Sequence, residues 1–284
     1  GMTMSDDQDN LFAKNRALTS GFRFDEQVVK VFPDMIARSV PGYELVIPMI
    51  GLLARRYTQP DSIIYDLGCS LGAASLAISL AVRTGGTRII AVDNSEAMVT
   101  RCQKNMSEKC GQVPIDVRLQ NILETQIEDA SVVVLNFTLQ FLDRFQRQSL
   151  INRIAKGMRP GGVLILSEKI CFEDKLEQDD QTAWHHDFKR AQGYSDLEIA
   201  QKRNALEDVL RPETEVSHFN RLHLAGFSRY HRWFHCCSFT SYIAFKCRTP
   251  TWIYIPQDGR NWQSWPGGTF KIFPTATCHA GSKR

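Results

Sequence analysis

The chain has 284 residues, of which 43% are hydrophobic and 23% are charged. These values are typical of a globular protein and exclude wholesale disorder and a collagen-like repeat. The formal net charge is +3, but residues 247–284 hold five basic residues against one aspartate, which leaves −1 for residues 1–246. A broad basic surface is therefore not indicated, and we expect no direct binding of nucleic acid.

Membrane and secretory segments are not expected. The longest apolar run, Leu45–Ala54, contains Pro48 and is much shorter than the roughly 20 residues that a membrane span needs. The first twenty residues include Asp6, Asp7 and Asp9, which is unlike a secretory signal. No CxxC pair occurs among the eight cysteines. Together these features predict a cytoplasmic protein with reduced cysteines that does not associate with membranes.

The first part of the chain predicts helices that lead into alternating strands and helices. Helices are expected at Asp25–Val31 and Tyr43–Tyr57, with Pro33 and Pro41 breaking the segment between them. Alternation of this kind is typical of a parallel sheet with crossover helices. In chain order, it consists of a strand at Ser62–Leu67, a helix at Ala73–Val82, a strand at Arg88–Val92, a helix at Glu96–Lys104, strands at Ile115–Leu119 and Val132–Phe137, a helix at Arg144–Met158, a turn at Pro160–Gly162 and a strand at Val163–Ser167.

Two helical segments interrupt this alternation between residues 175 and 210, and the second begins with a capping-box pattern at Ser195–Glu198. Gly226–Phe234 and Phe239–Lys246 follow as two paired strands. We therefore predict an α/β protein with a doubly wound, Rossmann-like sheet that is mostly parallel and ends in an antiparallel pair, with additional N-terminal and inserted helices. The predicted domain organisation is a flexible segment at 1–24, one domain at 25–246 with its insertion at about 175–210, and a basic, aromatic tail at 247–284.

A glycine turn follows the first expected strand, in the sequence Asp66–Gly72. Glycine at such a turn lets the backbone approach a ligand closely, and ligands of open α/β sheets bind at the carboxyl ends of the strands. Gly68 and Gly72 do not form the GxGxxG fingerprint of dinucleotide-binding proteins, so a nicotinamide cofactor is not indicated. The alternative is an ordinary strand–helix turn.

Asp93 and Asn94 end the second expected strand, 25 residues after Gly68. A carboxylate at this position can accept hydrogen bonds from both ribose hydroxyls of a nucleoside. Its alternative role is to cap the following helix, although Ser95 is also available for that. Together with the glycine turn, Asp93 favours a nucleoside ligand without a pyrophosphate, and S-adenosylmethionine fits this description.

Polar residues also follow the next two expected strands. Asn121 is placed to address an adenine amino group and Ile122 to cover the ring; the alternative, which the pattern alone favours, is a solvated loop. Asn136 ends the apolar fourth strand, where methyltransferases place groups that contact substrate or cofactor. Its alternative is a cap, with Phe137 and Phe141 in the core.

The inserted helices hold two further candidates. The run His185–Asp187 suggests a metal site, but adjacent helical residues do not share a face and no third ligand has suitable spacing, so packing or hydrogen bonding is the better interpretation. Arg203 can clamp a carboxylate through its planar guanidinium. From the pattern alone, a solvated helix face is favoured for Arg203.

Several longer strings resemble those of the bacterial carboxy-S-adenosyl-L-methionine synthases, within the class I methyltransferase superfamily. The resemblance covers roughly residues 10–246. The strings are Phe24–Glu26, Val31–Ile36, Arg38–Tyr43, Tyr65–Ala74, Leu135–Leu142, Leu166–Lys169, Gly193–Ser195 and Gln201–Arg203.

The resemblance implies an enzyme, a transferase that converts S-adenosylmethionine and prephenate to carboxy-S-adenosylmethionine and phenylpyruvate. It also implies a homodimer and a functional link to a tRNA carboxymethyltransferase that modifies wobble uridine. Arg203 would hold the transferred carboxylate, and Asn121 stands where the family commonly has aspartate. The cofactor contacts implied are Tyr43, Gly68, Cys69, Ser70, Asp93, Asn94, Asn121, Ile122, Asn136 and Arg203.

Two other functions remain open from the sequence. One is a conventional S-adenosylmethionine-dependent methyltransferase that acts on a small molecule or RNA. The other is a non-catalytic module that binds the cofactor. The ligand that co-purifies distinguishes them, because only a carboxy-S-adenosyl-L-methionine synthase would retain a species heavier than the cofactor by one carboxyl group. No residue stands out as a general base, which leaves the substrate as its candidate source.

Overall fold

The computed structural model describes residues 25–109, 111–207, 209–248, 252–253 and 273–274. For residues 203–207, 252–253 and 273–274 it describes the backbone alone. The expected N-terminal segment 1–24 and most of the expected tail 247–284 therefore lie outside the described residues.

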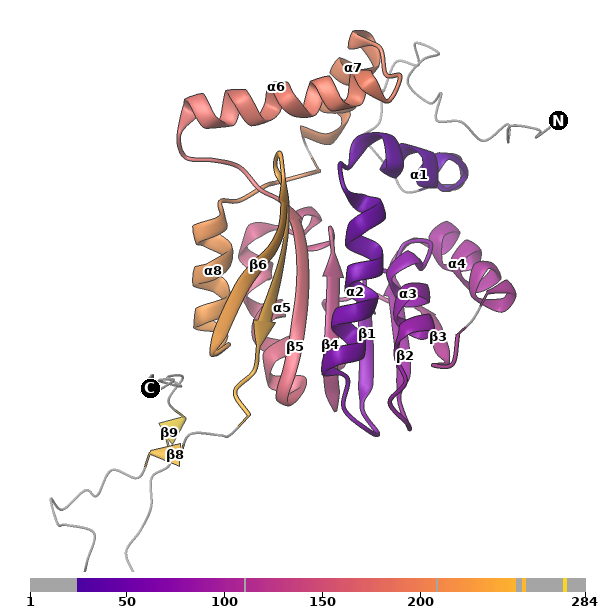
Figure 1. Ribbon diagram of the computed structural model, residues 1–284, viewed down its shortest axis with the longest axis vertical. Helices are drawn as coiled ribbons and strands as arrows, with labels where there is room; N and C mark the ends of the chain where they lie inside the picture. Colours follow the sequence, from indigo (N-terminus) through magenta and orange to yellow (C-terminus); the bar gives the residue numbers. More distant parts are fainter. Residues whose placement is uncertain (1–24, 110, 208, 249–251, 254–272, 275–284) are drawn as a thin grey trace, which may run out of the picture.

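A seven-stranded sheet with the order β3-β2-β1-β4-β5-β7-β6 forms the centre of the molecule (Figure 1). The first five strands pair in parallel, and β7 pairs antiparallel with both β5 and β6. This is the predicted class I methyltransferase arrangement. The strands are β1 (Ile63–Leu67), β2 (Arg88–Asp93), β3 (Ile115–Leu119), β4 (Ala130–Asn136), β5 (Met158–Lys169), β6 (Arg229–Cys236) and β7 (Phe239–Phe245). A separate pair is formed by β8 (Trp252–Ile253) and β9 (Phe273–Pro274).

Helices cover both faces of the sheet, because successive side chains of a buried strand point to opposite faces. Ile64 of β1 packs in the cluster that includes residues of α2, α3 and α4, whereas Tyr65 packs in the cluster with α5 and α8. The helices on the first face are α2 (Tyr43–Tyr57), α3 (Ala73–Ala81) and α4 (Glu96–Glu108), and those on the second are α5 (Arg144–Gly157) and α8 (Glu215–Leu224).

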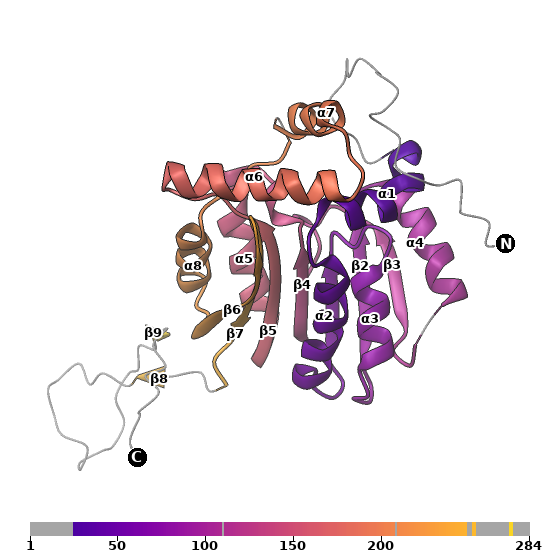
Figure 2. The same ribbon diagram turned by 45° about the horizontal axis from the view of Figure 1, so that its top comes forward.

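Three further helices, α1 (Glu26–Ser39), α6 (Lys175–Ala191) and α7 (Asp196–Glu207), lie across the end of the sheet at which the parallel strands finish (Figures 1 and 2). Arg38 of α1 joins this layer to the loop between α6 and α7. Its Nε donates to the carbonyl of Gln192 at 2.9 Å, and its guanidinium lies 3.9 Å from the ring centroid of Tyr194. The inserted helices thus form a roof over the carboxyl ends of the strands.

Two local predictions are wrong, one helix was not predicted, and the capping box is confirmed. Pro33 does not break α1, which continues to Ser39 although proline removes one intrahelical hydrogen bond. The strand expected at Val163 begins at Met158, and Pro160–Gly162 form a bulge within it. Helix α8 has no counterpart among the predicted elements. The capping box is present, with Ser195 and Glu198 exchanging hydrogen bonds of 3.1 and 3.2 Å.

The cysteines depart in part from the expectation of a fully reduced protein, since Cys247 is disulfide-bonded. Free thiols are found at Cys69, Cys102, Cys171, Cys236 and Cys237. Within the described ranges, no single helix is long and apolar enough to cross a membrane; α1 and α2 meet that test only as a pair bent by 98°.

Candidate active site

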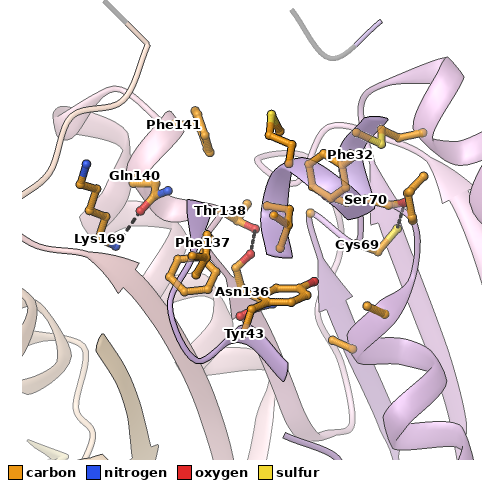
Figure 3. Close-up of a pocket in the computed structure, with 18 of the residues that line it drawn as sticks. Phe32, Tyr43, Cys69, Ser70, Asn136, Phe137, Thr138, Gln140, Phe141 and Lys169 are labelled. Carbon is orange, nitrogen blue, oxygen red and sulfur yellow. Dashed lines mark hydrogen bonds between the residues drawn. The ribbon is translucent and has the colours of Figure 1, made fainter. Parts of the chain in front are cut away.

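A cavity of about 440 Å³ lies at the carboxyl ends of β1, β2, β4 and β5, and residues of α1, α6 and α7 line it from above. Figure 3 shows some of its lining residues. Its volume is within the range of small-molecule sites. Residues from all these elements line it, including Phe32 of α1 and Lys189 of α6. The topology therefore brings the expected motifs to one place, as an open α/β sheet requires.

The glycine turn forms one wall of the cavity and needs its glycine at residue 68. Gly68 has a φ of +79°, and a Cβ there would collide with the side chain of Thr138. The N–H groups of Gly68 and Cys69 donate to the carbonyl of Val92 at 2.7 and 2.9 Å. This tight contact between the first two strand ends leaves Cys69 and Ser70 facing the cavity (Figure 3).

Asp93 fixes the glycine turn and remains available to a ligand. One carboxylate oxygen accepts from the N–H of Ser70 at 3.0 Å and the other from the N–H of Ser95 at 2.9 Å. Each oxygen keeps lone-pair capacity, and Asp93 lines the cavity beside Asn94. Burial raises the pKa of Asp93, and backbone N–H groups, those of Ser95 and Ser70 foremost, counter that rise. Ser95 caps α4 through the N–H of Met98, so Asp93 is not needed as the helix cap.

Asn121 and Ile122 line the same end of the cavity. The side-chain oxygen of Asn121 accepts from the N–H of Leu123 at 3.0 Å, which holds the loop in a turn, and Asn121 is otherwise exposed. Ile122 is buried and belongs to the hydrophobic core. The solvated-loop alternative therefore describes the side chain of Asn121 but not that of Ile122.

The segment after β4 contributes the middle of the cavity. Asn136, Phe137 and Phe141 all line it, so neither phenylalanine is a core residue as the alternative reading proposed. Phe137 has a φ of +56°, which is rare for an aromatic residue, and its N–H donates to the carbonyl of Ser167 at 2.9 Å. Backbone strain of this kind is often found at functional sites. Thr138 secures the turn by donating to the carbonyl of Leu67 at 3.0 Å.

Two acceptors in the cavity have no hydrogen-bond donor among the described residues. They are the Oδ1 atoms of Asp66 and Asn136, both buried. The other carboxylate oxygen of Asp66 accepts from the hydroxyl of Ser75 at 2.6 Å, while burial raises the pKa of Asp66 to about 6. Burial and the charge of Asp66 raise the pKa of Tyr43, which lies beside Asn136 (Figure 3). A ligand that carries donors would satisfy both acceptors.

The opposite end of the cavity is lined by three lysines: Lys169 at the end of β5, Lys189 on α6 and Lys202 on α7. The ammonium of Lys202 donates to the hydroxyl of Tyr194 at 2.5 Å. That of Lys169 lies 5.8 Å from the ring centroid of Phe239. Burial and the charges of the two other lysines lower the pKa of Lys189 to about 7.

His185 belongs to this end of the cavity through packing and hydrogen bonding. Its Nε2 lies 2.7 Å from the carbonyl oxygen of Ser39, and its ring centroid lies 4.9 Å from that of Phe239. Burial lowers its pKa to about 2, so the ring is neutral near pH 7. Asp187 pairs instead with Arg190 at 2.9 Å. In the ranges that the structure covers, no three His, Cys, Asp or Glu side chains are grouped to hold a metal ion.

A methyltransferase-domain family model matches residues 64–162. Carboxy-S-adenosyl-L-methionine synthases from Yersinia enterocolitica and from Yersinia pestis strain Pestoides F are each 52% identical to the chain over 239 residues, which is 84% of this chain and 90% of each relative. The chain belongs to the carboxy-S-adenosyl-L-methionine synthase family. As a member, it is an S-adenosylmethionine-dependent transferase of methyltransferase fold.

Solved methyltransferase structures resemble this synthase-family member in fold. A putative O-methyltransferase from Nostoc punctiforme superposes with a TM-score of 0.55 at 16% identity, over 78% of this chain and 60% of that one. Human N-acetylserotonin methyltransferase in complex with SAM gives a TM-score of 0.51 at 18% identity, over 78% and 55%. At such identities the similarity shows the fold alone.

The structure brings nine of the ten predicted cofactor contacts to this one cavity; the side chain of the tenth, Arg203, lies outside the described residues. The three lysines were missed as ligand-facing residues. One signal was available for Lys189: Gln181, His185 and Lys189 are spaced by four residues and are the buried residues of α6. A polar stripe of this kind is usually a solvent-exposed face, so the spacing alone does not identify it as a cavity wall.

Proposed function

We propose that this protein is a carboxy-S-adenosyl-L-methionine synthase, which converts S-adenosylmethionine and prephenate to carboxy-S-adenosylmethionine, phenylpyruvate and water. One observation carries the proposal: a single cavity has hydrogen-bond acceptors at one end and three lysines at the other. The acceptor end suits a nucleoside with an amino-acid chain, and the lysine end suits an organic anion. The 52% identity to relatives of this name supports the same reaction.

The acceptor end of the cavity fits S-adenosylmethionine. Asp93 and Asn94 would hold the ribose hydroxyls, Asn121 the adenine amino group and Ile122 the face of the ring. The glycine turn at Gly68–Ser70 would lie against the ligand, because all three of its residues line the cavity.

Asp66, Asn136 and Tyr43 complete the acceptor end of the cavity. The unpartnered oxygens of Asp66 and Asn136 suit the ammonium group of the amino-acid chain. Tyr43 lines the cavity next to them, and its raised pKa keeps the hydroxyl protonated as a donor. When bound, S-adenosylmethionine supplies a sulfonium whose methyl carbon is acidic.

The roof of α1, α6 and α7 explains how carbon dioxide could be transferred without escaping. Carbon dioxide lost from prephenate forms the new carbon–carbon bond. The proton removed from the methyl carbon leaves with the hydroxyl group of prephenate as water, so that the substrate supplies the base. A cavity covered by these helices would keep the two reacting fragments close together and make the step effectively intramolecular. Arg203, which belongs to α7, would neutralise the new carboxylate.

The biological setting is proposed from the same family membership. The product would be consumed by a tRNA carboxymethyltransferase that modifies wobble uridine, and this protein would act as a cytoplasmic homodimer. The net charge of −1 over residues 1–246 supports a role that supplies the small molecule rather than one that binds the tRNA.

The test incubates the purified full chain with S-adenosylmethionine and prephenate and follows both products by mass spectrometry. We expect carboxy-S-adenosylmethionine and phenylpyruvate to appear in equal amounts, and neither to form when prephenate is omitted. Transfer of an unmodified methyl group to an acceptor would establish a conventional methyltransferase instead. Tight cofactor binding with no turnover of prephenate would establish a binding module.

A further inference from the structure

Three lysines gather at one end of the cavity, away from its lining carboxylates. Lys169, Lys189 and Lys202 approach it from three elements, and the only carboxylates among the described lining residues, Asp66 and Asp93, belong to β1 and β2. In Figure 3, Lys169 lies on the side of the cavity opposite Ser70. Cations gathered in a partly desolvated space repel one another, and an anion removes that repulsion.

Lys189 is the most informative lysine of this group. The residue is 7% exposed, and within the described ranges no hydrogen bond or ion pair holds its ammonium. Lys202, in contrast, has the hydroxyl of Tyr194 as an acceptor. Burying an ammonium without a partner costs considerable free energy, so its placement against a cavity indicates an anionic partner from outside the chain. Its lowered pKa is consistent with this environment.

The surroundings of Lys189 identify the class of anion. Phe137 and Phe239 line this end of the cavity, with their ring centroids 6.0 Å apart. His185 packs edge-on against Phe239 and is neutral. A fully hydrated inorganic anion gains nothing from such apolar walls, whereas a carboxylate attached to an unsaturated ring buries the ring against them.

The second substrate has two carboxylates, and the chemistry of decarboxylation indicates which of them Lys189 would bind. An ammonium stabilises a carboxylate more than it stabilises the neutral carbon dioxide that leaves, so pairing with the departing group would raise the barrier. Resting on the proposed function, we propose that Lys189 binds the carboxylate that the second substrate keeps, the one shared by prephenate and phenylpyruvate, and thereby selects an aryl or cyclohexadienyl keto acid. The departing carboxylate is left without this partner.

The test replaces Lys189 in the full chain by methionine, which has similar length and no charge. We expect phenylpyruvate, measured as a competitive inhibitor and by calorimetry, to bind about 10- to 150-fold more weakly, with a parallel rise in KM for prephenate. The dissociation constant for S-adenosylmethionine should change less than about twofold, since that ligand lies at the other end of the cavity. Lys189→Arg should recover part of the phenylpyruvate affinity because it keeps the charge.

Lys175→Met is the matched control, because it removes the same charge from an exposed position on α6. The ligand-free Lys189→Met protein should melt at or above the wild-type temperature, since an unpaired buried cation has been removed. Unchanged phenylpyruvate binding in a folded Lys189→Met protein overturns the inference, as does an equal loss for phenylpyruvate and S-adenosylmethionine.

The outcomes also separate the inference from the proposed function. A wild-type protein that does not turn over prephenate but binds phenylpyruvate through Lys189 would refute the proposed reaction and support the subsite. A wild-type protein that turns over prephenate, with Lys189→Met unchanged in KM, would support the reaction and overturn the subsite. Absence of both turnover and phenylpyruvate binding in the wild type would overturn both.

Discussion

Asp93 has two tasks that a single carboxylate can perform together. Its carboxylate accepts hydrogen bonds from the N–H groups of Ser70 and Ser95, and these bonds fix the glycine turn and the start of α4. The carboxylate also lines the cavity, where it has lone pairs available to a ligand. The sequence predicts the ligand-binding task from the position of Asp93 at a strand end, but not the structural one, because the bond to Ser70 depends on how two strand ends meet.

Replacing Asp93 by alanine should weaken the binding of S-adenosylmethionine at least tenfold. The substitution removes a charged acceptor for two ribose hydroxyls, each hydrogen bond being worth about 1.5–3 kcal/mol. Isothermal calorimetry measures the loss. Asp116→Ala, which removes an exposed carboxylate from β3, should bind as the wild type does. Unchanged affinity in the Asp93 variant would contradict the nucleoside assignment.

Arg203 should discriminate carboxy-S-adenosylmethionine from S-adenosylmethionine, because the two ligands differ by one carboxylate. A guanidinium–carboxylate pair in a closed site is worth roughly 1.5–3 kcal/mol, or about 10- to 150-fold in affinity. Arg203→Ala should lose that factor for the carboxylated ligand alone, and Arg203→Lys should recover only part of it. Calorimetry with both ligands is the measurement, with Arg190→Ala on the neighbouring helix as control. Equal losses for both ligands would indicate a structural role.

At the scale of elements, α6 shows why the lysine end escapes sequence analysis. A helix with buried polar residues at 181, 185 and 189 has the same spacing as one with a hydrated face, and only the sheet beneath it decides between them. The same dependence on context explains α1, whose Pro33 predicts a break that packing overrides. The capping box at the start of α7 is local, and it is predicted correctly.

Helix α6 should also make anion binding depend on pH. Burial and the charges of Lys169 and Lys202 lower the pKa of Lys189 to about 7, while His185, with a pKa of about 2, stays neutral throughout. Below about pH 7, Lys189 is already protonated in the free protein. Above that pH it is mostly neutral, so binding of a carboxylate requires Lys189 to take up a proton. The dissociation constant for phenylpyruvate should therefore rise as pH increases from about 7 to about 9, by up to about tenfold per pH unit.

The lowered pKa of Lys189 also determines how the free energy of unfolding changes with pH. Between about pH 7 and the ordinary lysine pKa of 10.5, the unfolded chain holds more protons than the folded one at this residue, so its contribution to the free energy of unfolding increases with pH. Competition binding and thermal melts over this range measure the two effects. Both should disappear in Lys189→Met and persist in Lys175→Met; identical pH profiles for wild type and Lys189→Met would contradict the assignment.

At the scale of the whole molecule, the sequence predicts the part of the site that lies at successive strand ends. It does not predict the lysine end, which depends on how the inserted helices pack over the sheet. Gly68–Ser70, Asp93 and Asn136 each end a strand of one parallel sheet, so their meeting follows from the alternation of strands and helices. The lysines of β5, α6 and α7 meet only because the inserted helices fold back as a roof over the sheet. No periodicity in the sequence encodes that return.

Residues 247–284 should be dispensable for catalysis, because among the described residues Lys246 makes the last hydrogen bonds that hold the C-terminal strand to the rest of the domain. The backbone of Lys246 exchanges hydrogen bonds with Gly161 and Gly162 at 3.0 and 2.9 Å, and its ammonium donates to the carbonyls of Ala155 and Met158 at 2.6 and 2.5 Å. These contacts join the last core strand to the end of α5 and the bulge of β5. None of the described residues that line the cavity comes after Phe239.

A chain that ends at Lys246 should therefore fold and retain its prephenate-dependent formation of carboxy-S-adenosylmethionine. The expected kcat and KM lie within about twofold of those of the full chain, since ends beyond the packed core contribute little to a distant site. A matched truncation before Phe239 removes β7, which pairs with both β5 and β6, and should abolish folding, which circular dichroism would report. If the chain ending at Lys246 folds with native circular dichroism but loses turnover, the tail is part of the catalytic unit and the boundary at residue 246 is wrong.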